Sequence, residues 1–199
     1  MDAANKSIGI IILAAGASVR MKQPKQLLKF DNKTLLRRAV ETAIAANYEI
    51  VVVVLGANFE QTKSEIADFP INICFNENWR EGLSSSIKIG LKNLLKIAPE
   101  VAACLVSLAD QPFITAKHLN LYAEKFFQTN NPIIAAEYNG TIGVPALFSR
   151  EIFDELCEIS GDKGAKMLID RHQNRLTTIN LPEAAFDIDT PEDFAKLNQ

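Results

Sequence analysis

Apolar runs of strand length alternate with segments of helical periodicity along most of the chain. The runs are rich in β-branched residues, and EIVVVVL (49–55) is apolar on both faces, as an interior strand of a parallel sheet should be. Such runs cover residues 8–15, 49–55, 71–75, 101–108, 132–138, 144–148 and 175–181. The spacing of apolar residues predicts helices from about residue 34, over 59–68, from residues 84 and 115, and over 149–159, 162–172 and 190–198.

This alternation predicts an α/β fold: a three-layer α/β/α arrangement around a mostly parallel, Rossmann-like sheet with right-handed crossovers. A turn at Asn139–Gly140 between two strand-like runs predicts a small antiparallel addition. Ser84, Thr115 and Thr190 stand where helix N-caps are expected. No composition shift, repeat or linker divides the sequence, so we expect residues 1–199 to form a single domain.

Composition and charge narrow the function classes. Of the 199 residues, 48% are hydrophobic and 23% charged, which excludes a disordered or collagen-like chain. The net charge of −3 argues against a nucleic-acid partner. An odd number of cysteines, with Cys74 and Cys104 inside apolar runs, favours a reducing compartment. No apolar run approaches the roughly 20 residues of a membrane span, so we expect a cytoplasmic protein without a membrane partner.

Ligands of open α/β sheets bind beyond the carboxyl ends of the strands. The loops after the first, third and fourth strands are therefore expected to meet at one edge. The first of these loops, residues 16–26, combines Gly16 with Arg20, Lys22 and Lys25. It is interpreted as a phosphate pocket or as a solvated basic loop. Its pattern is neither GxxxxGK[ST] nor GxGxxG, which disfavours an ordinary P-loop or a dinucleotide fold.

Each polar group in the other two loops has two possible interpretations. WREGLSSSI (79–87) enters a helix N-terminus, where the serines serve either a ligand or the cap, and Trp79 either stacks on a ring or packs. Asp110 follows an apolar strand, where a carboxylate needs a cation or hydrogen-bond donors. Asp187 and Asp189 share one face of an extended segment, which offers a second acidic group beside Asp110 for a divalent ion. In the alternative interpretation, Asp189 or Thr190 is a helix cap.

Five segments carry a resemblance when they are taken together: LAAGASVRMKQPKQLL, NENWREGLSSSIKIGL, SLADQP, GDKGAKMLI and FDIDTPEDF. They occur in this order and span nearly the whole chain. The chain resembles the nucleotidyltransferase superfamily of sugar-nucleotide-forming enzymes. It is most similar to the molybdenum cofactor cytidylyltransferase branch, to which GLSSSI, LADQP and DIDTPED point.

The resemblance implies the fold of the nucleotide-diphospho-sugar transferases and a reaction. CMP would pass from CTP to the phosphate of molybdenum-bearing molybdopterin, with release of pyrophosphate and formation of molybdopterin cytosine dinucleotide. A molybdoenzyme recipient would make transient contact. The residues that it implicates are Arg20 and Lys25 for catalysis, Leu13, Ala14, Ala15, Gly16, Gly82 and Ser85 for nucleotide binding, and Asp110 and Asp189 for Mg²⁺, with Mn²⁺ as an alternative ion.

Two departures from the family pattern bear on the acceptor and on phosphate binding. Lys22 stands where the superfamily usually has Gly, and Val144 stands before Pro145 where a polar residue is common. Alternative functions are a GTP-using or sugar-phosphate-using relative and a carrier that delivers the cofactor without catalysis. The presence of both Asp110 and Asp189 favours the enzyme. His118 and His172 are interpreted as structural.

Overall fold

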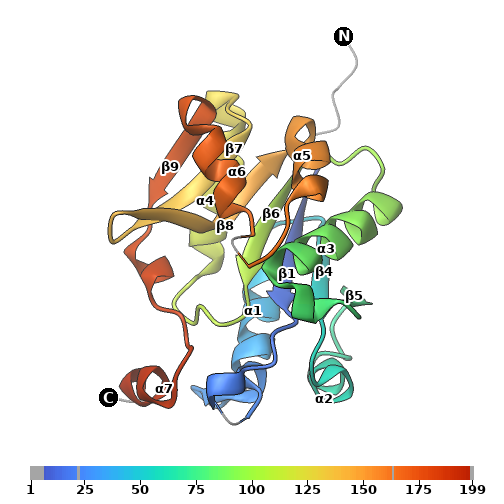
Figure 1. Ribbon diagram of the computed structural model, residues 1–199, viewed down its shortest axis with the longest axis vertical. Helices are drawn as coiled ribbons and strands as arrows, with labels where there is room; N and C mark the ends of the chain where they lie inside the picture. The colour runs from blue at the N-terminus through green and yellow to red at the C-terminus, as the bar shows by residue number, and fades with distance from the viewer. Residues whose placement is uncertain (1–6, 22, 163, 198–199) are drawn as a thin grey trace.

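The computed structural model describes residues 7–21, 23–162 and 164–197. A seven-stranded sheet with the order β5-β4-β1-β6-β8-β7-β9 forms its centre (Figure 1). The strands are β1 (Ile8–Ala14), β4 (Ile50–Leu55), β5 (Asn72–Phe75), β6 (Ala103–Leu108), β7 (Ile133–Tyr138), β8 (Thr141–Ser149) and β9 (Leu176–Asn180). A separate two-stranded antiparallel sheet pairs β2 (Lys29–Phe30) with β3 (Lys33–Thr34).

The strand directions match the expected, mostly parallel sheet. β1 pairs in parallel with β4 and β6, β4 with β5, and β7 with β9. β8 runs antiparallel to both of its neighbours, β6 and β7. The hairpin turn at Asn139–Gly140 is confirmed, and its two strands supply the expected antiparallel addition as members of the main sheet.

Helices cover both faces of this sheet (Figure 1). The helices of the described residues are α1 (Leu35–Ile44), α2 (Phe59–Glu65), α3 (Leu83–Ile97), α4 (Ala116–Thr129), α5 (Phe153–Glu158), α6 (Lys166–Arg171) and α7 (Pro191–Leu197), the last of which packs apart from the sheet. None of the helices in the described ranges is long and apolar enough to cross a membrane.

The alternation of side chains along β1 builds two cores, one on each face of the sheet. Ile10 and Ile12 pack on one side with residues of α1 and α4. Ile11 and Leu13 pack on the other side with residues of α3, α5 and α6. All four side chains are at most 5% exposed. The apolar character of both faces therefore arises because each face meets its own helix layer, and the three-layer prediction is confirmed.

Two of the three predicted N-caps are confirmed. Thr115 accepts a hydrogen bond from the backbone N–H of His118, and Thr190 accepts one from the N–H of Asp193. The Ser84 prediction is wrong, because α3 begins at Leu83 with Gly82 as its N-cap. Ser84 is 1% exposed, and its hydroxyl donates to the carbonyl of Gly161 at 2.7 Å. That contact joins α3 to a loop 77 residues later in the chain.

A third apolar cluster lies apart from the two main cores. Its buried members come from the first loop, from α1 and from the end of the chain: Met21, Leu28, Leu35, Ile188 and Leu197. In Figure 1, α7 lies near the segment around residue 20 at the same end of the molecule. This C-terminal cluster therefore holds the end of the chain against the loop that follows β1.

Two buried tyrosines allow a test of the packing between α4 and the loop that precedes β4. The hydroxyl of Tyr48 donates to the carbonyl of Leu119 at 2.7 Å. Tyr48→Phe is expected to lower the free energy of unfolding by about 0.5–1.5 kcal/mol, as for the loss of one buried hydrogen bond. Tyr122→Phe is the control, since no partner for its buried hydroxyl exists among the described residues. Urea unfolding measures both, and a larger loss for Tyr122→Phe would contradict this account.

Candidate active site

A cleft of about 630 Å³ opens where β1 and β6 end. Its walls come from the three loops that were expected to meet, together with Asp162 from a fourth loop and Asp187 and Asp189 near the C-terminus. Of the residues proposed from the sequence, those lining it are Leu13, Ala14, Ala15, Gly16, Arg20, Lys25, Gly82, Asp110 and Asp189. The fold thus gathers at one edge side chains that are up to about 170 residues apart in the sequence.

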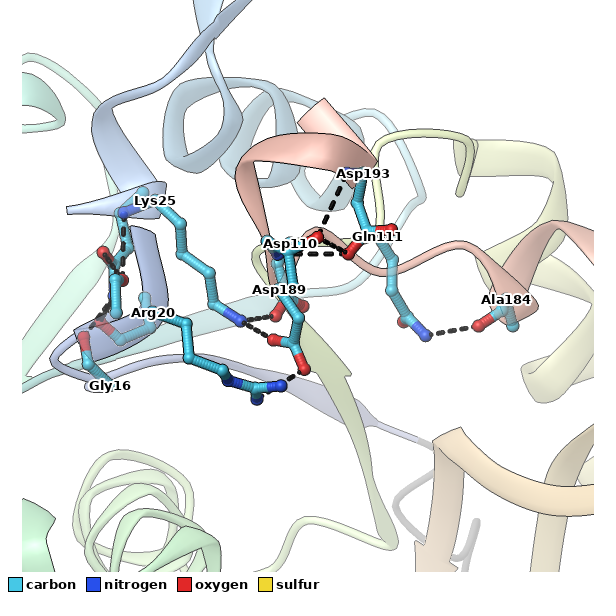
Figure 2. A network of polar contacts seen from close by, with 12 residues as sticks. Gly16, Arg20, Lys25, Asp110, Gln111, Ala184, Asp189 and Asp193 are labelled. Carbon is cyan, nitrogen blue, oxygen red and sulfur yellow. Dashed lines mark hydrogen bonds and ion pairs between the residues drawn. The ribbon is translucent and has the colours of Figure 1, made fainter. Parts of the chain in front are cut away.

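Ion pairs between the first loop and two carboxylates form the centre of the cleft (Figure 2). The ammonium of Lys25 contacts Oδ2 of Asp110 and lies 2.8 Å from Oδ1 of Asp189. Arg20 Nη2 donates to the other oxygen of Asp189, also at 2.8 Å. The Lys25 and Asp110 side chains are 18% and 13% exposed, whereas that of Arg20 is 69% exposed. Lys25 is therefore the inner cation and Arg20 the outer one.

The charges of this cluster shift the pKa values of its members. Burial alone would lower the pKa of Lys25, but Asp110 and then Asp189 outweigh it, so the pKa is raised. Burial alone would raise the pKa of Asp189, but Lys25 and Arg20 hold it below its usual value. The pKa of Asp187 is raised by burial and by the charges of Asp110 and Asp189. The pairing therefore keeps both Lys25 and Asp189 charged at neutral pH.

A short extended arm carries Asp189 to the cleft. Ile188 is fully buried in the C-terminal cluster, and the carboxylates on either side of it, Asp187 and Asp189, line the cleft. The backbone N–H of Ile188 donates to the carbonyl of Asp110 at 3.2 Å. Gln111 Nε2 donates to the carbonyl of Ala184 at 2.9 Å (Figure 2). These contacts join the turn after β6 to the arm and so fix one carboxylate beside the other.

The opposite wall is built where α3 begins. Gly82 has a φ of +93°, and a Cβ on it would lie 2.3 Å from Oδ1 of Asp162, so glycine is required there. The Arg80 guanidinium lies 4.3 Å from the centre of the Trp79 ring, and both residues line the cleft. This wall therefore combines an aromatic surface, a backbone stretch without a side chain and charges of both signs.

Ser85 does not lie in the cleft. Its hydroxyl donates to the carbonyls of Asn78 and Gly82 at 2.9 and 2.8 Å, and it faces a different surface pocket. Ser86, one position on, lines the cleft instead and accepts a hydrogen bond from Asn76 Nδ2 at 3.0 Å. The run of three serines marked the correct turn of helix, but sequence alone did not say which serine faces inward.

Several other candidates lie outside the cleft or outside the described residues. Lys22 is not among the described residues. Val144 packs against the core on the α3 face. His118 belongs to the capping box of α4, and His172 pairs with Glu155 at 3.0 Å, so both histidines have structural contacts. Gln26, Arg80 and Asp162, which the sequence reading did not propose as site residues, line the cleft.

The two central carboxylates suit a divalent ion in their chemistry. Mg²⁺ and Mn²⁺ prefer oxygen ligands, and Mg²⁺ is commonly held by one or two carboxylates with substrate phosphates and water. Oδ1 of Asp110 is buried and has no hydrogen-bond partner among the described residues, which leaves it available as a ligand. Nowhere in residues 7–21, 23–162 and 164–197 do three or more His, Cys, Asp or Glu side chains form a metal cluster. Asp110 and Asp189 therefore fit an ion whose coordination a substrate completes.

Comparison with known families agrees with this arrangement. A model of the MobA-like NTP transferase domain matches residues 10–176, which include most of β1, the basic loop and the turn that carries Asp110. The chain belongs to this family. It is therefore a nucleotidyltransferase by family. The cleft lies beyond the carboxyl ends of the strands, where open α/β sheets bind their ligands.

Individual relatives differ in their named activities. The chain is 25% identical to the molybdenum cofactor cytidylyltransferase of Escherichia coli K12 over 94% of each chain. It is 27% identical to the nicotine blue oxidoreductase of Paenarthrobacter nicotinovorans, also over 94% of each. The crystal structure of Rv0371c from Mycobacterium tuberculosis H37Rv aligns over 96% of each chain with a TM-score of 0.83 and 26% identity. A manganese complex of Rv0371c aligns with a TM-score of 0.79.

The C-terminal cluster gives a test of how the arm is held. Ile188→Ala is expected to lower the free energy of unfolding by about 2–4 kcal/mol, as for other large-to-small changes at buried sites. It should also weaken nucleoside triphosphate binding, because Asp189 loses its fixed position. Ile66→Ala is the matched control, because Ile66 is fully buried in the core that the sheet forms with α1 and α4. Calorimetric titration and urea unfolding measure the two effects, and equal binding by both variants would contradict the role of the arm.

Proposed function

We propose that this protein transfers CMP from CTP to the phosphate of molybdenum-bearing molybdopterin and releases pyrophosphate. The observation that carries the proposal is the convergence of Lys25 and Arg20 on Asp110 and Asp189 inside the cleft. A volume of about 630 Å³ is in the usual range for small-molecule sites. The five sequence segments and the E. coli relative named as a molybdenum cofactor cytidylyltransferase support the choice of substrates.

The chemistry of nucleotidyl transfer matches the residues present. A phosphate oxygen of the acceptor attacks the α-phosphorus of CTP, and the bond from that phosphorus to the oxygen bridging to the β-phosphorus breaks. Pyrophosphate leaves with the electron pair of that bond. The attacking oxygen is already a nucleophile, so neither a Ser-His-Asp triad nor a histidine base is required. Positioning and charge stabilisation then make the main contribution to catalysis.

Arg20 and Lys25 are the groups that we assign to the triphosphate. A guanidinium forks onto two phosphate oxygens, and an ammonium places a compact charge close to one. The inner position of Lys25 suits the α-phosphate, where charge develops during transfer, and the exposed Arg20 suits the outer phosphates. The backbone of residues 13–16 lines the same part of the cleft and supplies N–H groups to the nucleotide.

The charge balance of the cleft supports a divalent ion. Its lining in the described residues has the carboxylates Asp110, Asp162, Asp187 and Asp189 and the cations Arg20, Lys25 and Arg80. Carboxylates outnumber cations, so a highly negative triphosphate needs added positive charge to bind here. Asp110 and Asp189 would hold Mg²⁺, or Mn²⁺, which supplies that charge when it is bound. The manganese complex of Rv0371c supports this assignment.

The wall at the start of α3 is assigned to the base. The lack of a side chain on Gly82 lets the loop that carries Asp162 pack against the start of α3. Gly82 and Ser86 both line the cleft, where the Ser86 hydroxyl and backbone groups offer partners for the amino and carbonyl groups of cytosine. Ser86 therefore takes the place that Ser85 had in the sequence-based proposal. The molybdoenzyme that receives the product would contact the protein transiently, as part of the same proposal.

A panel of nucleotides tests the reaction. Pyrophosphate release is expected with CTP and Mg²⁺ when molybdenum-bearing molybdopterin is present, and much less with GTP, ATP or UTP. Asp110→Asn should reduce turnover by about 10²-fold or more in a protein that still folds, because the change removes a central charge, keeps the shape and leaves Lys25 paired with Asp189. Release with GTP alone would move the assignment to guanine-dinucleotide synthesis. Unchanged turnover in Asp110→Asn would exclude its role in ion binding.

The position of Lys25 predicts competition with the metal. Its ammonium contacts the same two carboxylates that are assigned to the ion, so it opposes binding of a divalent cation to the free protein. Lys25→Met should therefore increase the affinity of the nucleotide-free protein for Mn²⁺ by about 10-fold, on the scale of one close charge in a partly buried site. It should at the same time weaken CTP binding. Electron paramagnetic resonance of free Mn²⁺ measures the first effect, with Lys25→Arg as control. Weaker Mn²⁺ binding by Lys25→Met would contradict the shared site.

A further inference from the structure

Gln26 is a buried polar residue in the wall of the cleft, next to the catalytic lysine in sequence. Gln26 is only 3% exposed. The reaction proposed above gives it no role, and the sequence marks it only as the end of the basic loop. A buried amide is costly unless its donors and acceptor are satisfied, so its contacts indicate what it does.

The amide of Gln26 contacts the first loop at three points. Its Nε2 donates to the carbonyl of Ala14 at 3.0 Å and to the carbonyl of Gly16 at 2.7 Å. Its Oε1 accepts from the hydroxyl of Ser18 at 3.3 Å. Both amide hydrogens and the amide oxygen are therefore used within a segment of five residues. One side chain therefore holds residues 14–18 through three hydrogen bonds.

These contacts also set the direction of two backbone N–H groups. In a planar trans peptide, the C=O of one residue and the N–H of the next point in opposite directions. The carbonyls of Ala14 and Gly16 point toward Gln26, so the N–H groups of Ala15 and Ala17 point away from it. Both alanines line the cleft. Backbone N–H groups that converge on one region can bind an anion there.

Ser18 extends this arrangement to Lys25. Its oxygen accepts the backbone N–H of Lys25 at 2.9 Å while its hydrogen is donated to Gln26. Ser18 has a φ of +56°, a conformation that non-glycine residues adopt seldom and that these hydrogen bonds help to hold. The backbone position of Lys25 therefore depends on the same hydrogen bonds. The inner cation and the N–H groups are placed together.

We propose that Gln26 is a positioning residue for the triphosphate: it orients the N–H groups of Ala15 and Ala17 and, through Ser18, fixes the backbone of Lys25. The inference rests on the proposed function only in that the cleft binds a triphosphate; it does not depend on which base is bound. Glutamine suits the position because it donates two hydrogen bonds and accepts a third. Glutamate would oppose its oxygens to two carbonyls, and leucine would leave both carbonyls without a donor.

The test measures phosphate binding apart from base binding. The probes are inorganic tripolyphosphate and CTP, each titrated with Mn²⁺ into the full chain by calorimetry. Gln26→Leu and Gln26→Glu should each weaken tripolyphosphate and CTP by 10-fold or more. Ser18→Ala, at a partly exposed position, keeps the two donor contacts of Gln26 and should weaken both probes by about threefold. The Ser18→Ala variant tests the same hydrogen bonds even if the Gln26 variants fold poorly.

A matched control separates positioning from stability. Tyr48→Phe also removes a hydrogen bond from a buried side chain to a backbone carbonyl, and it lines a pocket away from the cleft. It should lower the thermal midpoint and leave tripolyphosphate affinity unchanged. Hydrogen exchange adds a local reading, because the Gln26 variants should speed exchange at residues 15–18 more than in the middle of β1.

The outcomes distinguish this inference from the proposed function. Tripolyphosphate affinity within twofold of wild type in Gln26→Leu, with Ser18→Ala also unchanged, would overturn the role of Gln26 alone. If the wild-type protein binds tripolyphosphate but not CTP, the cytidine assignment fails and the Gln26 comparison still stands. If it binds neither probe, the loop is not a phosphate cradle and both fail.

Discussion

The bridge formed by Lys25 between two carboxylates is the contact on which the site depends. Three charged side chains that are mostly removed from water are stable only when they are paired, because the cost of removing an isolated charge from water exceeds most single interactions. Lys25 lies 164 residues from Asp189 in the sequence, so this pairing requires the last part of the chain to return to the first loop. The bridge therefore links correct folding to a correctly assembled site.

The sheet order explains how such distant residues meet. β1 lies between β4 and β6 in the middle of the sheet, so the loops that follow β1 and β6 leave side by side at the carboxyl edge. These positions could be predicted, because the strands are continuous apolar runs and the sequence breaks them with glycine or with a charged turn. The fold class and most helices could be predicted for the same reason. The incorporation of β8 into the sheet could not, since a hairpin pattern does not say which strand it joins.

The placement of a residue at the cleft could be predicted where residue type and strand end coincide, as at Asp110 and Gly16. It could not be predicted where the direction of one side chain determines whether a residue faces the cleft. Ser85 and Ser86 have the same chemistry, and only the start of α3 at Leu83 determines which one faces the cleft. Asp162 was missed for another reason: it comes from a loop between α5 and α6, and the contact of Ser84 with Gly161 that brings it to the cleft has no local sequence signal. Gln26 was missed because its partners are backbone carbonyls, which every sequence has.

The two carboxylates are held by supports of different strength. Asp110 leaves β6, a strand paired on both sides within the main sheet and packed in both cores. Asp189 lies on an arm whose main apolar anchor is Ile188 in the small C-terminal cluster, and its side chain is 35% exposed against 13% for Asp110. Segments with fewer buried contacts open and shift at lower free energy than central strands. In the proposed reaction Lys25 exchanges a carboxylate for a phosphate, and the adjustment is therefore expected at Asp189, while Asp110 keeps its position.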